Sequence, residues 1–275
     1  HYATAGILPF DPQTGYYGGV MAYNEDPQAH NPYSQYMNNL NYEDRQEVNP
    51  TAYIDWTPIA GLTARVDYTL NYFNQFRVNA PLPTRAYNFQ TQAYGSRVYV
   101  GENAGVANYT DTGYKTQFNG RITYHKVIAN NHDLKGLLVY SEEYWSKRNQ
   151  TGSRNDRLHP SLQELNAALP DVQSASGSSD AEGLRSYIGR LNYVAFNTYL
   201  LEVNFRYDGS SKFLPGSQFG FFPSAALGWR FTQERFMEGS KGWLNEGKLR
   251  ASYGGLGNNS GVSRYEQQET LDNNA

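Results

Sequence analysis

The sequence has no cysteine, and this absence removes several kinds of chemistry at once. A chain without thiols forms no disulfide, no thiolate zinc site and no cysteine nucleophile. Long apolar runs are also missing, because no stretch approaches the about 18 residues that a membrane helix requires. Excess positive charge is missing too: the net charge is -3, and nothing in the chain is basic enough to favour nucleic acid as a partner.

The start of the chain carries no targeting signal. It begins at His1, and a basic region followed by an apolar region, as in a secretory leader, is absent. We therefore expect either a mature chain or an excerpt of a longer one.

Aromatic residues are abundant although the chain is polar on average. They make up 15% of the sequence, whereas the mean hydropathy is -0.70. This combination fits a secreted carbohydrate-binding β protein or an outer-membrane barrel, which has aromatic girdles outside and a wet lumen inside. A barrel strand needs only about ten residues with every second one apolar, so a low mean hydropathy does not exclude a membrane.

The strongest sequence period is two, the period of a β-strand. In residues 62–72 the even positions are apolar, from Leu62 through Val66 to Tyr72, and the odd positions are polar, as at Arg65 and Asp67. Similar alternation in seven further segments brings the prediction to about eight strands. The further segments are 52–56, 117–124, 134–140, 186–193, 199–208, 221–231 and 248–253.

The predicted connections alternate between short and long. Short turns are expected at 58–61, 129–132 and 195–197, and long or medium connections at 77–112, 146–183 and 209–218. One longer connection, 233–246, falls on the short side and contains a possible helical turn at Phe236–Met237. Short periplasmic turns and long extracellular loops are typical of outer-membrane barrels. We therefore predict an all-β, antiparallel transmembrane barrel segment.

The chain shows no interdomain linker, so we expect one partial domain over residues 1–275. Residues 1–45 are predicted to form an extracellular loop, 46–258 the barrel strands with their connections, and 259–275 the start of the next extracellular loop.

Several motifs in the second half resemble one family, the SusC/RagA-type TonB-dependent outer-membrane transporters. They keep the order and spacing of that family over about residues 184–260, whereas the first half is more generic. The motifs are L-R-S-Y-I-G-R-L-N-Y at 184–193, R-Y-D-G-S-S-K-F at 206–213, F-F-P-S at 221–224, G-W-R at 228–230 and L-R-A-S-Y-G at 249–254.

The resemblance implies a barrel of about 22 strands closed by an N-terminal plug domain. It implies a SusD-like surface lipoprotein over the extracellular loops, energy from the TonB complex, and an oligosaccharide or oligopeptide substrate. The plug domain and more than half of the strands are absent from this sequence. We therefore interpret the chain as a central excerpt of the barrel, in contact with outer-membrane lipid.

Candidate catalytic and metal-binding residues are few. The five histidines show no metal-ligand spacing, and Glu142 and Glu143 are adjacent, so on a strand they face opposite ways. Arg206 and Asp208 share a face and are predicted to form an ion pair in the lumen. The glycine-rich 254–259 segment lacks the lysine of a phosphate-binding loop, so we expect a strand that ends in a loop. We therefore predict no cofactor, no metal and no enzyme.

Aromatic residues in the predicted long loops are the functional candidates, because tyrosine commonly serves recognition surfaces. They could stack on sugar rings or hold peptide side chains, and they could equally pack the loops on each other or on a partner. The candidates are Tyr87, Phe89, Tyr94, Tyr99 and Tyr109.

Two alternatives to an importer stay open. One is a complete small barrel of eight strands that acts as a passive pore or adhesin, although the polar end at 272–275 does not suit a closing strand. The other is a soluble secreted β protein that binds or cleaves glycans. If the side of the sheet with Leu62, Val66 and Leu70 were covered by a second layer, the membrane assignment would be wrong.

Overall fold

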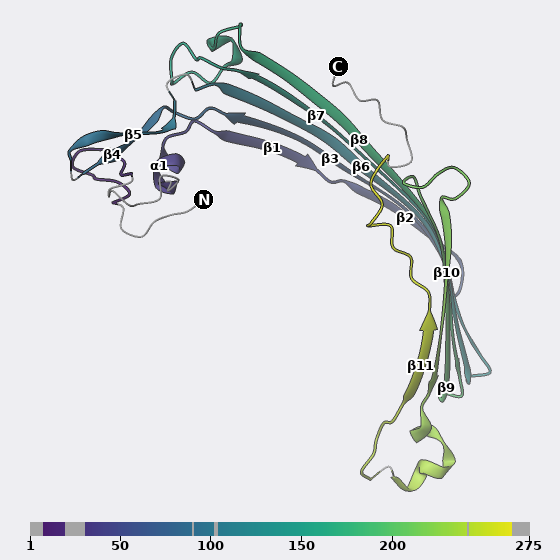
Figure 1. The fold of residues 1–275 in the computed structure, drawn as a ribbon. Coiled ribbons are helices and arrows are strands. Elements are labelled where there is room, and N and C mark those ends of the chain that lie inside the picture. The colour runs from purple at the N-terminus through teal and green to yellow at the C-terminus, as the bar shows by residue number, and fades with distance from the viewer. Residues whose placement is uncertain (1–7, 20–30, 90, 102–103, 241, 266–275) are drawn as a thin grey trace. The chain divides into compact units, whose positions relative to one another are not determined.

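The structure of the chain is a computed structural model in which β-strands predominate (Figure 1). It describes residues 8–19, 31–89, 91–101, 104–240 and 242–265. The chain divides into two compact units. Unit 1 contains residues 1–47, 73–112 and 148–179, and unit 2 contains 48–72, 113–147 and 180–275. Each unit is described below on its own.

Eleven strands are present in the described part of the chain. They are β1 (Tyr42–Val48), β2 (Thr51–Ile59), β3 (Leu62–Asn79), β4 (Thr84–Asn88), β5 (Ala93–Val100), β6 (Val106–Ile128), β7 (His132–Arg154), β8 (Gln173–Ala195), β9 (Tyr199–Ser210), β10 (Phe219–Trp229) and β11 (Leu249–Gly254). The helices are α1 (Pro32–Met37) and the 3-10 turns η1 (Leu165–Ala167), η2 (Phe231–Gln233) and η3 (Arg235–Ser240). Within the described ranges, no helix is long and apolar enough to cross a membrane.

Nine of the strands form one sheet in the order β1-β3-β6-β7-β8-β9-β10-β11, and β2 also pairs with β3. The pairs β2–β3, β8–β9, β9–β10 and β10–β11 are antiparallel. Apart from the separate β4–β5 hairpin, and from β1 and β2, which both pair with β3, strands that follow each other in the chain are neighbours in the sheet (Figure 1). All eight strands predicted from the sequence are present, and the antiparallel fold is confirmed.

Tight turns join the strands at one end of the sheet. Ala129 and Asn130 both have positive φ, as do Phe196 and Asn197, which is the pattern of a type I′ hairpin turn. Gly61 (φ 82°) turns between β2 and β3, where an added Cβ would lie 2.2 Å from the carbonyl oxygen of His125. The predicted short turns are therefore confirmed, and η3 covers the helical turn expected at Phe236–Met237.

One face of unit 2 is apolar and open. Ring contacts follow one another across four neighbouring strands, from β6 to β9: Phe118–Tyr140 (6.0 Å), Tyr140–Tyr187 (5.3 Å) and Tyr187–Tyr207 (6.3 Å). Phe219 of β10 stacks next on Tyr207 at 4.8 Å. We call this series of rings the aromatic row. Its members are partly or largely exposed, as expected for side chains that meet a nonaqueous solvent and not a protein core.

The described part of the chain has almost no hydrophobic interior. Val66, whose burial would have contradicted the membrane assignment, is 47% exposed. The buried apolar side chains among the described residues are only valine and alanine, namely Val78, Ala80, Ala86, Val106, Ala168, Ala195 and Ala226. A soluble sandwich buries large aliphatic and aromatic side chains between its sheets. This sheet buries none, so a soluble sandwich does not describe it.

The opposite face of unit 2 carries polar side chains that satisfy one another between strands. Asn119 donates to Asp67 (2.6 Å) and accepts from the Ser141 hydroxyl (2.7 Å), which links β3, β6 and β7. Farther along, Arg190 donates to Asn204 at 2.7 Å. The strict two-residue alternation therefore produces two faces of different chemistry, as the sequence predicts.

Unit 1 has a small core of its own. Val78, Ala80, Val106 and Ala168 are buried together, with Leu40, Phe76 and Leu165 packed against them. The guanidinium of Arg157, which is 8% exposed, donates to the carbonyl oxygens of Pro81, Ala104, Pro160 and Leu162. Burial lowers the pKa of Arg157 below its usual range. The segments 80–105 and 155–172 are thus joined through one buried cation.

The structure differs from the sequence prediction mainly in strand length. β6, β7 and β8 have 23 residues each, so the connections predicted at 77–112 and 146–183 shorten to 80–105 and 155–172. The added parts contain polar residues on both faces, so hydropathy alternation does not mark them. β1, β4, β5 and α1 were not predicted for the same reason. β10 ends at Trp229, two residues earlier than predicted, because Phe231 begins η2.

Candidate functional site

Three of the five predicted aromatic candidates lie together in unit 1. The ring centroid of Tyr87 is 5.2 Å from that of Phe89 and 5.3 Å from that of Tyr94. Tyr16, which was not predicted, completes the group at 4.3 Å from Tyr87 and 5.6 Å from Tyr94. We call these four residues the loop aromatic cluster. Its most accessible member is Tyr94, which is 54% exposed.

The β4–β5 hairpin explains why the cluster forms. Tyr87 and Tyr94 are directly opposite in its antiparallel register, so their side chains share a face. The backbone of Tyr87 also bonds the N-terminal segment, donating to Tyr17 O (2.9 Å) and accepting from Gly19 N (3.1 Å). This second contact brings Tyr16 to the cluster.

A sequence signal for Tyr16 exists, although the prediction missed it. The Asp11 carboxylate accepts from the backbone N–H of Gln13 and from the hydroxyl of Thr14, and Gly15 has φ 75°. These hydrogen bonds lower the pKa of Asp11 below its usual range. An Asp-x-x-Thr-Gly sequence is a turn signal, and the aromatic residue after it is placed by that turn.

Of the other two candidates, Tyr109 lies outside this cluster. The ring of Tyr109, on β6, faces the guanidinium of Arg77 at 4.6 Å. Tyr99 is in β5, but its side chain lies outside the described residues. Ligand contact at any of the five positions stays a prediction.

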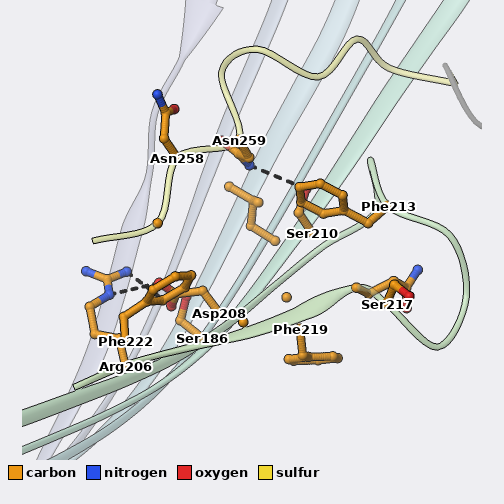
Figure 2. A pocket seen from close by; sticks show the side chains of 15 residues that line it. Ser186, Arg206, Asp208, Ser210, Phe213, Ser217, Phe219, Phe222, Asn258 and Asn259 are labelled. Carbon is orange, nitrogen blue, oxygen red and sulfur yellow. Dashed lines mark hydrogen bonds and ion pairs between the residues drawn. The ribbon is translucent and has the colours of Figure 1, made fainter. Parts of the chain in front are cut away.

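Unit 2 contains a pocket on its polar face, which the sequence did not reveal (Figure 2). It measures about 350 Å³ and lies between the ends of β8, β9 and β10 and the segments 211–218 and 255–259. We call it the polar-face pocket. Its lining includes Ser186, Arg206, Asp208, Ser210, Phe213, Ser217, Phe222, Asn258 and Asn259. Phe219, whose ring belongs to the aromatic row on the other face, also borders the space.

Electrostatically the polar-face pocket is close to neutral. Its only charged lining residues are Arg206 and Asp208, which pair with each other at 3.0 and 3.2 Å, as the sequence predicted. The rest of the polar lining consists of serine hydroxyls and amides, and Asn259 donates to Ser210 at 3.4 Å (Figure 2). An uncharged polar group, such as a sugar hydroxyl or a peptide amide, suits this lining.

Close glycine packing shapes the same pocket. A Cβ on Gly257 would lie 2.2 Å from the ring of Phe222, so only glycine lets the 255–259 segment approach β10 this closely. The glycine-rich motif after β11 is therefore a loop that packs on an aromatic ring, which confirms the prediction of a strand that ends in a loop. Among the described residues, no group of histidine and acidic side chains could hold a metal ion.

Two curated proteins align with almost the whole chain. TonB-dependent receptor P26 of Formosa agariphila is 27% identical over 269 residues, which cover 93% of this chain and 25% of the relative. TonB-dependent receptor SusC of Bacteroides thetaiotaomicron is 30% identical over an alignment of 280 residues, and the alignment covers 92% of this chain and 26% of the relative. No protein-family model matches the sequence. The chain therefore spans about a quarter of the length of these relatives.

Solved structures give the same answer for the fold. The structure of the RagAB peptide transporter superposes with a TM-score of 0.73 over 90% of this chain and 26% of that chain, at 20% identity. The RagAB peptide importer in the open-open state also gives a TM-score of 0.73, at 19% identity. This chain matches part of the barrel of SusC/RagA-type TonB-dependent transporters.

The match decides between the readings of the two-faced sheet. The chain resembles a segment of these barrels, which places it in the outer membrane with its apolar face toward lipid. The placement of the short turns on the periplasmic side and of the long connections on the extracellular side stays a prediction. The matched relatives are receptors and transporters, which agrees with a protein that is not an enzyme.

Proposed function

We propose that this chain is part of an active outer-membrane importer of oligosaccharides or oligopeptides. The observation that supports this most directly is the combination of an uncovered apolar face with a match that covers more than nine-tenths of the chain. The apolar face closes against lipid, and the polar face lines the substrate path. The segment itself supplies a wall and loops, so the transport cycle belongs to the parent protein.

The proposal includes two partners. A SusD-like surface lipoprotein covers the extracellular loops, and the TonB complex supplies energy through the plug region. Both follow from the resemblance to SusC, and the structural neighbours assembled as RagAB give them further support. The loop segments suit such a partner, because Arg157 and the unit 1 core already hold them in one arrangement without it.

The test uses the full-length parent in its native outer membrane. Deletion of the parent gene should abolish growth on the substrate that the transporter imports, and a tonB deletion should have the same effect. A tagged parent should copurify with a surface lipoprotein from detergent extracts. Uptake that continues without TonB would exclude active import and leave a passive pore.

The proposed ligand contacts in the loop aromatic cluster can be tested separately. Tyr94→Ala removes the most exposed ring of the cluster, so we expect weaker substrate binding with unchanged folding. Tyr36→Ala is a matched control, since Tyr36 is 78% exposed and lies on α1. Equal binding by both variants and the unmodified parent would show that the cluster only packs the loops.

A further inference from the structure

An ion pair lies on the apolar face of unit 2, directly beside the aromatic row. The guanidinium of Arg185 on β8 donates to the Glu142 carboxylate on β7 at 3.1 Å, and the hydroxyl of Tyr140 donates to the same carboxylate. Tyr140 belongs to the aromatic row, and so does Tyr187, which is on the same side of β8 as Arg185 because side chains alternate along a strand. The ion pair therefore lies on the side of the sheet that faces lipid.

This position sets the depth of the pair in the membrane. A charged pair in hydrocarbon loses its hydration at a high cost, whereas tyrosine rings gather at the level of the lipid headgroups. Rings lie on both sides of the pair along β7: Tyr140 in the aromatic row, and Tyr144, whose ring centroid is 5.8 Å from that of Tyr114. Charges between tyrosines on a lipid-facing surface fit the headgroup layer. The pair therefore meets headgroups and not acyl chains.

A hollow of about 220 Å³ lies beside the pair, near the end of β9. On the lipid-facing side its lining includes Glu142, Tyr144, Arg185 and Phe219. Arg185 is directly opposite Gly209 in the register of β8 and β9. A Cβ on Gly209 would lie 2.5 Å from the Phe219 ring, so the glycine lets this ring lie low against the sheet. The Arg185 side chain next to it is 48% exposed and can be reached from the bilayer.

Both partners of the pair keep hydrogen-bonding capacity for a ligand. Within the described ranges the Arg185 guanidinium donates to Glu142 alone, through one of its several N–H groups. A guanidinium suits phosphate, because its parallel N–H groups can bind two phosphate oxygens at once. Each carboxylate oxygen of Glu142 accepts one hydrogen bond here and has room for another. The pair thus presents a cation and an anion side by side to the headgroup layer.

We propose that Glu142 and Arg185 bind a lipid headgroup that carries both a phosphate and a primary amine, as phosphoethanolamine does. The phosphate accepts from Arg185 and the ammonium donates to Glu142, so each charge of the headgroup meets its opposite. The acyl chains then pack on the aromatic row. The face on which the pair lies selects lipid as the occupant, and the two charges select the headgroup. This site belongs to the outer wall of the barrel and does not depend on which substrate the parent imports.

Other headgroups fit the pair less well. A headgroup with a phosphate and no amine places a second negative charge beside Glu142. A choline headgroup carries a positive charge, but it has no N–H to donate to the carboxylate. Comparison of the three headgroups therefore tests the contribution of each charge.

The experiment measures lipid binding to the full-length parent in detergent by native mass spectrometry. The probes are phosphatidylethanolamine, phosphatidylglycerol and phosphatidylcholine with identical short acyl chains. The unmodified parent should bind the first phosphatidylethanolamine molecule about threefold or more tightly than either of the other lipids. The preference arises from one charge-assisted hydrogen bond at a partly exposed site.

Two variants separate the two charges. Arg185→Gln should weaken phosphatidylethanolamine binding about fivefold or more, because the phosphate loses its cation. Glu142→Gln should remove the preference for phosphatidylethanolamine over phosphatidylglycerol, because the carboxylate that distinguishes them is gone. Arg190→Gln is the matched control, since Arg190 is on the same strand but donates to Asn204 on the polar face, and this variant should bind lipid as the unmodified parent does.

The lipid preference of the unmodified parent keeps the inference testable even if Arg185→Gln folds poorly. Equal binding of the three lipids by the unmodified parent would overturn the inference. An Arg185→Gln variant that binds phosphatidylethanolamine normally would overturn it as well, and so would a Glu142→Gln variant that keeps the preference. Equal weakening by Arg185→Gln and Arg190→Gln would also overturn it, because the effect would then not belong to the lipid-facing arginine.

Discussion

Arg264 ties the segment after β11 to the polar face of unit 2, and its removal should release that segment. Its guanidinium pairs with Asp180 and Glu182 of β8, both at 2.8 Å, and lies 4.3 Å from the ring centre of Trp145. The hydroxyl of the neighbouring residue, Tyr265, accepts a hydrogen bond from the backbone N–H of Ala181. The exchange rate of that amide therefore reports whether the segment is attached.

The size of the effect follows from these contacts. The Arg264 side chain is 39% exposed, so each ion pair is screened and contributes about 0.2–1 kcal/mol. The cation–π contact adds about 0.5–1 kcal/mol at an exposed site. Arg264→Ala should thus cost about 1–3 kcal/mol, which corresponds to about 5- to 150-fold faster exchange at Ala181.

The assay is hydrogen exchange by mass spectrometry on the full-length parent, at low and high salt. Salt should accelerate exchange in the unmodified protein and have little further effect in Arg264→Ala, because the ion pairs are already gone. Arg264→Lys keeps the charge without the planar fork and should fall between the two. An unchanged rate in Arg264→Ala would refute the argument that these contacts hold the segment.

Three further predictions concern other contacts. Gly189→Ala should destabilise the barrel by about 1–3 kcal/mol in urea unfolding, because the new Cβ would meet the Phe205 ring at 2.1 Å; Phe205→Ala in the same chain should restore stability, and an additive double variant would contradict the clash. Arg157→Met should cost about 3 kcal/mol or more and speed proteolysis of 155–172, since four carbonyl acceptors lose their donor; proteolysis at the normal rate would show that the core alone holds the loop. Tyr199 and Trp229 donate to Glu234, which lowers its pKa below the ordinary 4.5. Above pH 4.5 the ionised Glu234 should therefore hold the 230–248 connection, and the connection should loosen as the pH falls through the lowered pKa. Amide hydrogen exchange in 230–248 measures this, and a Glu234→Gln variant with the same acid dependence of exchange would argue against it.

The sequence predicted the part of the fold that meets lipid and missed most of the part that does not. Within the membrane each strand must alternate, because one face meets hydrocarbon and the other meets water. That constraint is visible in Leu62–Tyr72. Beyond the membrane both faces of β8 are wet, so residues 173–183 show no alternation and look like a loop.

The candidate sites show a similar division. Three aromatic residues near one another in sequence, Tyr87, Phe89 and Tyr94, could be grouped because a hairpin brings close neighbours together. Tyr16 could not, since its place depends on backbone pairing with β4 across about 70 residues of chain. The polar-face pocket joins segments near 186, 213 and 258, and no periodic pattern records that kind of long-range contact.

The length of β8 has a further consequence for energetics. A strand crosses the hydrocarbon with about ten residues, yet β8 has 23, so more than half of it is hydrogen-bonded backbone in an aqueous setting. Backbone that is already fixed loses little conformational entropy when a molecule settles on it, whereas a mobile loop must first be ordered. Binding of a ligand to this part of β8 should therefore carry a small entropic penalty and show a fast association rate, close to the diffusion limit. Stopped-flow kinetics on the parent can measure that rate.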